Sequence, residues 1–180
     1  MHASQHIINQ TKKWIDDVVV ACHFCPFAAQ AVKQKKIHYE VETSTGSDAC
    51  MDAVLRELIR LDNDADIETS FLIFPHTFTQ FDDFLDLVAL AEALLKRNGY
   101  DGIYQLASFH PLYQFDDAPE NDAANYTNRS AYPMLHLLRE ASIDRALEHY
   151  KNPENIPAAN IEFARGKGLS FMEKLRDACF

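Results

Sequence analysis

Two histidines in this sequence directly follow strand-like segments. His76 comes after the apolar run 69–74, and His110 ends the run 103–109. Ligands of open α/β sheets bind beyond the carboxyl ends of the strands, and neighbouring strands lie about 4.8 Å apart. We therefore expect the two imidazoles to share one pocket, where they would suit general acid–base catalysis or metal binding. Two unrelated surface positions are the alternative.

A cysteine at the start of a helix is the second candidate. Cys25 precedes Pro26, a residue favoured at the first helical position. Free N–H groups at that position stabilise a thiolate, which lowers the thiol pKa and makes the sulfur nucleophilic. A buried apolar cysteine is the alternative. Cys22 completes a C-x-x-C spacing, but one such pair after a helix is a weak metal or redox signal, and we expect no disulfide.

Polar residues suited to anion binding follow the long segment 112–132. Arg129 precedes an expected helix, where a guanidinium and free N–H groups direct positive charge the same way. On that helix His136, Arg139 and Glu140 fall at i, i+3 and i+4, which is one face. An exposed Arg139–Glu140 ion pair is the alternative. The expected binding residues are Asn128, Arg129, His136, Arg139 and Glu140.

The elements that must position these residues alternate between helices and strands. Hydrophobic periodicity predicts helices over residues 4–22, 27–33, 47–63, 81–98, 133–150 and within 156–179 (interrupted near 166–168), and strands over 36–43, 69–74 and 103–109. Strands joined through helices tend to lie parallel. We expect a single α/β domain over residues 1–180, with a small, mainly parallel, three-stranded sheet covered by helices. A fourth short strand has room in the long segment.

That long segment, residues 112–132, contains no glycine and carries four aromatic residues. Irregular segments of this length are uncommon in compact domains unless they are functional or disordered. So many aromatic residues argue against disorder. We expect the segment to be ordered and to pack over the site as a lid.

Charge and composition exclude several classes of protein. The formal net charge is −10, which repels nucleic acids and anionic membrane surfaces. No apolar run reaches the length of a membrane span, and the first residues lack a secretion signal pattern. We expect a cytoplasmic protein with four reduced cysteines that binds neither nucleic acid nor membrane. Nothing in the sequence specifies a cofactor or an oligomeric state.

Five short motifs together resemble a known family. They are Cys25-Pro26-Phe27-Ala28, Phe74-Pro75-His76, Gln105-Leu106-Ala107-Ser108-Phe109-His110-Pro111, Thr127-Asn128-Arg129-Ser130 and His136-Leu137-Leu138-Arg139-Glu140. The combination resembles the bacterial domain of unknown function 1415 over about residues 5–175. The resemblance implies a family without an assigned activity. It also implies that Cys25 is the family cysteine and Cys22 incidental, while Ala131 stands where the family pattern has proline.

The leading hypothesis is an enzyme that acts on a small anionic metabolite at the C-terminal edge of the sheet. Cys25 would be the nucleophile, and His110 or His76 the general base or acid. Arg129 and Arg139 would hold the anion.

Two other functions remain open from the sequence. The first is a mononuclear metal site formed by His76, His110 and Asp116, with His136 as an optional fourth ligand. The second is a non-catalytic binding or interaction module, in which the polar residues only organise the long segment.

Overall fold

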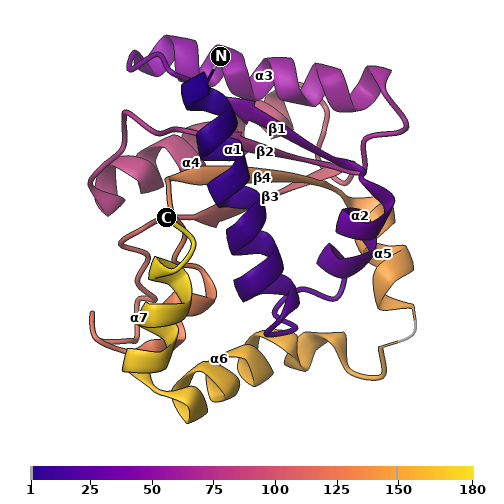
Figure 1. The fold of residues 1–180 in the computed structure, drawn as a ribbon. Helices are drawn as coiled ribbons and strands as arrows, with labels where there is room; N and C mark the ends of the chain where they lie inside the picture. Colours follow the sequence, from indigo (N-terminus) through magenta and orange to yellow (C-terminus); the bar gives the residue numbers. More distant parts are fainter. Residues whose placement is uncertain (1, 149) are drawn as a thin grey trace.

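The computed structural model describes residues 2–148 and 150–180. Its centre is a four-stranded sheet in the order β1-β2-β4-β3 (Figure 1). The strands are β1 (Ile37–Val41), β2 (Thr69–Ile73), β3 (Tyr104–Phe109) and β4 (Met134–Arg139). β1 and β2 are parallel, whereas β4 lies between β2 and β3 and is antiparallel to both. The predicted α/β class is confirmed, but the sheet has four strands and one parallel pair.

The helices cover both faces of this sheet. They are α1 (His2–Trp14), α2 (Ala28–Gln34), α3 (Ser47–Asn63), α4 (Phe81–Arg97), α5 (Glu140–Leu147), α6 (Ile156–Lys167) and α7 (Leu169–Asp177). A π-helical segment, η1 (Ile15–Val20), extends α1, and η2 (Ala123–Thr127) and η3 (Pro153–Asn155) are short 3-10 helices. Gly168, at φ +84°, separates α6 from α7, as the sequence predicted.

The helix predicted from Pro133 is wrong in its first half. Residues 134–139 form the central strand β4, and the helix begins only at Glu140. A central strand is apolar on both faces, so its residues show no alternation, and a short apolar run does not distinguish such a strand from a helix. The fourth strand is therefore this run and not part of segment 112–132.

Alternation along β4 separates two hydrophobic layers. Met134 packs with α1, η1, α6 and α7, whereas Leu135 and Leu137 pack with α3 and α4. Figure 1 shows α1 crossing one side of the sheet. His136 shares the face of Met134, which is called the α1 face below. The opposite side is called the α3 face.

Candidate functional site

A cavity of about 240 Å³ lies on the α1 face, between the sheet and helices α2 and α5. Much of its wall is formed by small side chains, and these leave space that larger residues would fill. Four alanines contribute to the wall: Ala28, Ala31, Ala107 and Ala146. Ile15 and Val19 of the π-helical segment close another side. The polar residues among the lining are Cys25, Thr69, Gln105 and His136.

His136 lies in the floor of the cavity on β4. Its ring stacks on Phe71 with the centroids 3.9 Å apart, and its Nε2 lies 2.5 Å from Thr69 Oγ1. The Thr69 hydroxyl donates its single proton to Leu137 O at 2.6 Å. Thr69 Oγ1 must therefore accept from His136 Nε2–H, which leaves Nδ1 unprotonated.

The unprotonated Nδ1 faces the cavity. Within residues 2–148 and 150–180, every side-chain nitrogen or oxygen that is shut off from the surface has a hydrogen-bond partner. Nδ1 has no such partner there, so it must open onto accessible space, and His136 lines the cavity. Burial lowers the pKa of His136 to about 3, so the imidazole is neutral at neutral pH. Nδ1 is thus a hydrogen-bond acceptor.

Cys25 lies in the turn between η1 and α2 and is half-buried at the cavity. Burial raises the pKa of its thiol, and the backbone N–H groups of Phe27 and Ala28 oppose that rise only in part. The lowered pKa expected from the sequence is therefore wrong, because desolvation outweighs the amide hydrogen bonds. All four cysteines of the chain are free thiols in the structure.

The two histidines at the strand ends do not meet in an open pocket. β4 separates β2 from β3, so the strand ends are two spacings apart, about 10 Å, instead of one. His76 is exposed in the turn after β2, whereas His110 is fully buried between Phe81 and Phe84.

Both ring nitrogens of His110 are already used. Nδ1 accepts from Leu112 N at 3.0 Å, and Nε2 donates to Phe78 O at 2.8 Å. Burial lowers the pKa of His110, and the hydrogen bond to Phe78 opposes the shift. No nitrogen is left for a metal ion or a proton transfer, and Asp116 is exposed on the surface. The residues His76, His110 and Asp116 are therefore not assembled as ligands.

Arg129 organises the long segment from inside. Its Nε donates to Tyr113 O and an Nη to Glu120 O, both at 2.9 Å, and its guanidinium stacks on the Tyr126 ring. Asn125 makes similar hydrogen bonds to the backbone of the segment. Residues 112–132 are thus ordered, as expected, but they pack beside α6 and α7 and do not line the cavity.

Asn128 is half-buried in the same segment, where its Oδ1 accepts from the Thr127 hydroxyl at 3.1 Å. It too contributes to local structure. Neither Asn128 nor Arg129 lines the cavity that holds Cys25 and His136.

The expected single face of His136, Arg139 and Glu140 does not exist. On a strand, residues three apart point to opposite faces, so Arg139 lies on the α3 face. Its guanidinium donates to the carbonyls of Ile67 and Asp64, both at 3.0 Å, and so holds the chain after α3. Glu140 begins α5 and is half-buried.

Fold and site thus define an α/β protein with a mixed four-stranded sheet and a neutral, thiol-containing cavity. The family model described as "Protein of unknown function (DUF1415)" matches residues 6–174, and the chain belongs to this family. Neither the curated proteins nor the solved structures give a significant match to this chain. Among the described helices, none combines the length and apolar character needed to cross a bilayer.

Proposed function

We propose that this protein binds a small, neutral, largely apolar molecule in the cavity lined by Cys25 and His136. The observation that carries the proposal is the character of that cavity: an apolar wall surrounds a few polar groups, and its two titratable groups are uncharged at neutral pH. Ligand sites of this kind use apolar area for affinity and a few polar atoms for orientation. His136 Nδ1 would accept a hydrogen bond from the ligand.

The size of the cavity indicates the size of the ligand. A dry protein cavity of about 150 Å³ holds benzene. The larger space here, about 240 Å³, suits one substituted aromatic ring or a short branched chain. Phe71 and Phe109 add aromatic area to the same wall, and contact with a ligand at Phe71 would be edge-on, because its ring is stacked on Tyr39 and His136.

Charge in the cavity favours a neutral ligand over the anion expected from the sequence. No Lys, Arg, Asp or Glu is among the described residues that line it. An unpaired charge in such surroundings costs several kcal/mol or more. The two arginines expected to hold an anion, Arg129 and Arg139, are occupied by backbone carbonyls elsewhere.

The ionisation of the two titratable groups favours binding over nucleophilic catalysis. The raised pKa of Cys25 and the lowered pKa of His136 describe a neutral thiol and a neutral imidazole. A thiolate–imidazolium pair would shift both values in the opposite directions. In the ligand-free protein, Cys25 is therefore a weak donor at the cavity wall.

Two thiol reagents of the same chemistry test the proposal. Benzyl methanethiosulfonate is neutral and aromatic, whereas 2-sulfonatoethyl methanethiosulfonate is anionic. With rates normalised to those for free glutathione, the neutral reagent should label Cys25 more than about tenfold faster, because the anion must give up its hydration. Peptide mass spectrometry identifies the labelled cysteine, and Cys25→Ser is the control for label at the other cysteines.

A narrowed cavity provides a matched comparison. Ala146→Leu places a larger side chain in the wall and should slow the neutral reagent while leaving the anionic one little changed. Equal normalised rates for the two reagents in the native chain would instead place Cys25 on an open polar surface and contradict the proposal.

A further inference from the structure

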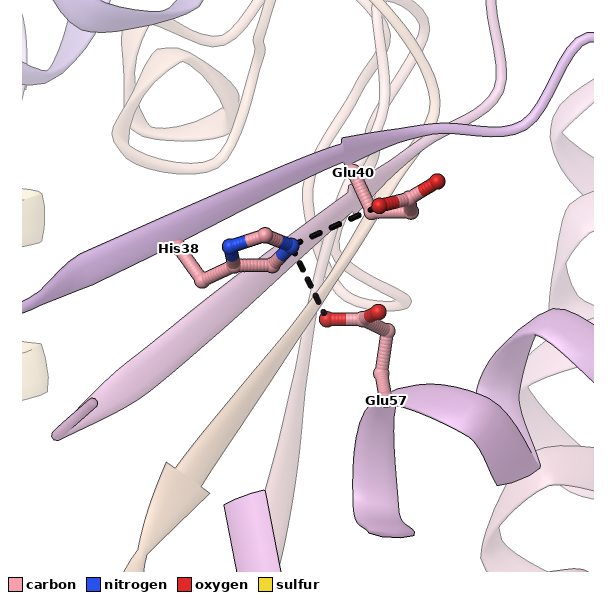
Figure 2. A group of neighbouring side chains, drawn as sticks. All are labelled: His38, Glu40 and Glu57. Atoms are coloured by element: carbon pink, nitrogen blue, oxygen red, sulfur yellow. Dashed lines mark hydrogen bonds and ion pairs between the residues drawn. The ribbon is translucent and has the colours of Figure 1, made fainter. Parts of the chain in front are cut away.

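Three potential metal ligands gather on the α3 face, on the far side of the sheet from the cavity. His38 and Glu40 are two residues apart on β1, so both side chains point to the same face of the sheet. Glu57 reaches them from α3 (Figure 2). His38 Nε2 lies 3.4 Å from Glu40 Oε2 and 3.7 Å from Glu57 Oε2. One ligand atom from each residue lies within 4.8 Å of the other two.

These separations are close to those in a metal site. Zinc binds imidazole nitrogen and carboxylate oxygen at about 2.0–2.2 Å in tetrahedral geometry, which places neighbouring ligand atoms about 3.3–3.5 Å apart. The imidazole-to-carboxylate distances of 3.4 and 3.7 Å need only a small contraction around an ion. Short side-chain rotations supply it, since His38 and Glu40 are half-exposed.

Glu57 is already oriented by neighbouring groups. Its side chain is 1% exposed, its Oε1 accepts from Arg60 Nε at 2.9 Å, and its Oε2 accepts from Ser70 Oγ at 2.5 Å. A carboxylate oxygen has capacity for a further partner beside Ser70. Hydrogen bonds of this type fix metal-ligating carboxylates in position.

The charge of the cluster also favours a cation. The two carboxylates face one guanidinium, that of Arg60, whose Nη lies 3.5 Å from Glu40 Oε2. A divalent ion would replace this long contact at Glu40, while Arg60 keeps its shorter hydrogen bond to Glu57. The half-exposed side of the cluster leaves a coordination position open to water.

We propose that His38, Glu40 and Glu57 form a binding site for one divalent transition-metal ion, with zinc as the preferred occupant. One imidazole and two carboxylates suit zinc or manganese better than magnesium, which binds oxygen ligands and retains its water. This site is independent of the cavity, because the sheet separates the two.

Calorimetric titration of the full-length, chelator-treated protein with Zn²⁺ tests the site. We expect one equivalent to bind, and His38→Ala and Glu40→Gln each to weaken the affinity at least about tenfold. Both substituted side chains are half-exposed, so the fold should survive. His6→Ala, at an exposed histidine on α1, is the matched control and should leave the affinity unchanged.

A second readout uses Co²⁺, whose visible absorption distinguishes protein ligands from a hydration shell. An intense spectrum in the native protein that is lost in His38→Ala supports the site. Two results would overturn it: no stoichiometric binding of Zn²⁺ or Mn²⁺ to the native chain, or equal affinity in the native chain and in His38→Ala. Ser70→Ala should retain the Co²⁺ spectrum with a weaker affinity, because Ser70 positions Glu57 and does not touch the ion.

Discussion

The two faces of the sheet differ in how they use their polar residues. In the cavity on the α1 face, polar groups are few and neutral, and small side chains leave an apolar space. On the α3 face, buried apolar side chains fill the layer between the sheet and helices α3 and α4, and charged groups gather beside it at the edge strand β1. Strand β2 contributes to both faces because its side chains alternate: Thr69 forms a hydrogen bond with His136 on the α1 face, whereas Ser70 forms one with Glu57 on the α3 face.

This comparison shows that a polar residue of a family motif need not belong to the site. His110, Arg129 and Arg139 lie away from the cavity, whereas other motif residues line it: Cys25, Pro26, Phe27, Ala28, Gln105, Ala107, Phe109, His136 and Leu138. His110 forms hydrogen bonds to the backbone of two turns, and Arg129 and Arg139 donate to backbone carbonyls. A polar residue that satisfies buried backbone groups is under as strong a physical constraint as one that binds a ligand.

The largest difference between the faces should appear when a core leucine is truncated. Leu58→Ala on α3 removes a fully buried side chain from the filled layer and should cost about 3–5 kcal/mol. Leu138→Ala beside the cavity should cost about 2 kcal/mol, because Leu138 already borders empty space and loses fewer contacts. Urea unfolding measures both; equal losses would mean that the cavity is closed in solution.

Acid should destabilise the α1 face through His136. Its folded pKa of about 3 lies far below the ordinary value near 6.5, so the unfolded chain takes up a proton that the folded chain refuses. The contribution of this neutral ring to the free energy of unfolding is fully present above about pH 6.5. Below that pH it is lost at up to about 1.4 kcal/mol per pH unit.

His136→Gln should reduce that slope, since Gln keeps an N–H for Thr69 and does not titrate. The free energy of unfolding, measured by urea at several pH values from 7 to about 4.5, gives the two slopes. Parallel slopes for the native chain and the variant would show that His136 is not buried as a neutral ring. His110 has a lowered pKa too and accounts for part of the slope that remains.

Enlarging a buried side chain should also affect the stability of the two faces differently. Ala91→Leu on α4 inserts a larger side chain into the filled layer and should cost about 1–3 kcal/mol. Ala146→Leu enters the cavity and should cost less than about 1 kcal/mol, or stabilise. Thermal unfolding of the two variants decides the point, and a larger loss from Ala146→Leu would contradict it.

The smallest effect is expected at the charged residues on the edge strand β1. Glu40→Gln in metal-free protein should change the free energy of unfolding by less than about 1 kcal/mol, because Glu40 is half-exposed and its contacts are long. A loss of several kcal/mol in chelator-treated protein would assign Glu40 a structural role and not the ligand role proposed above.

Much of the fold could be predicted from local patterns. The helices over 47–63 and 81–97 and the strands at 37–41 and 69–73 follow from periodicity and from turn residues. The central strand β4 could not, because an apolar run buried on both faces lacks the alternation that identifies a strand. Its misassignment also misplaced His136 and Arg139 on one helix face.

The site was predictable only in part. Cys25 and His136 were among the expected residues, but their shared cavity depends on where β4 inserts in the sheet. The free space between the sheet and helices α2 and α5 depends on small side chains that come from segments far apart in the sequence, so no single segment predicts it. His38 and Glu40 were visible as alternate residues of one strand, yet Glu57 joins them only through the packing of α3.

The central claim is that His136 presents an unprotonated Nδ1 to an apolar cavity, and ¹⁵N NMR of the histidine rings tests it directly. In the free protein at pH 7, we expect His136 as the neutral Nε2–H tautomer, assigned by comparison with His136→Gln. Titration with p-cresol should shift the Nδ1 resonance as the phenol donates to it, toluene should not, and Ala146→Leu should weaken the response. A protonated Nδ1, or the same spectrum with and without p-cresol, would contradict the account.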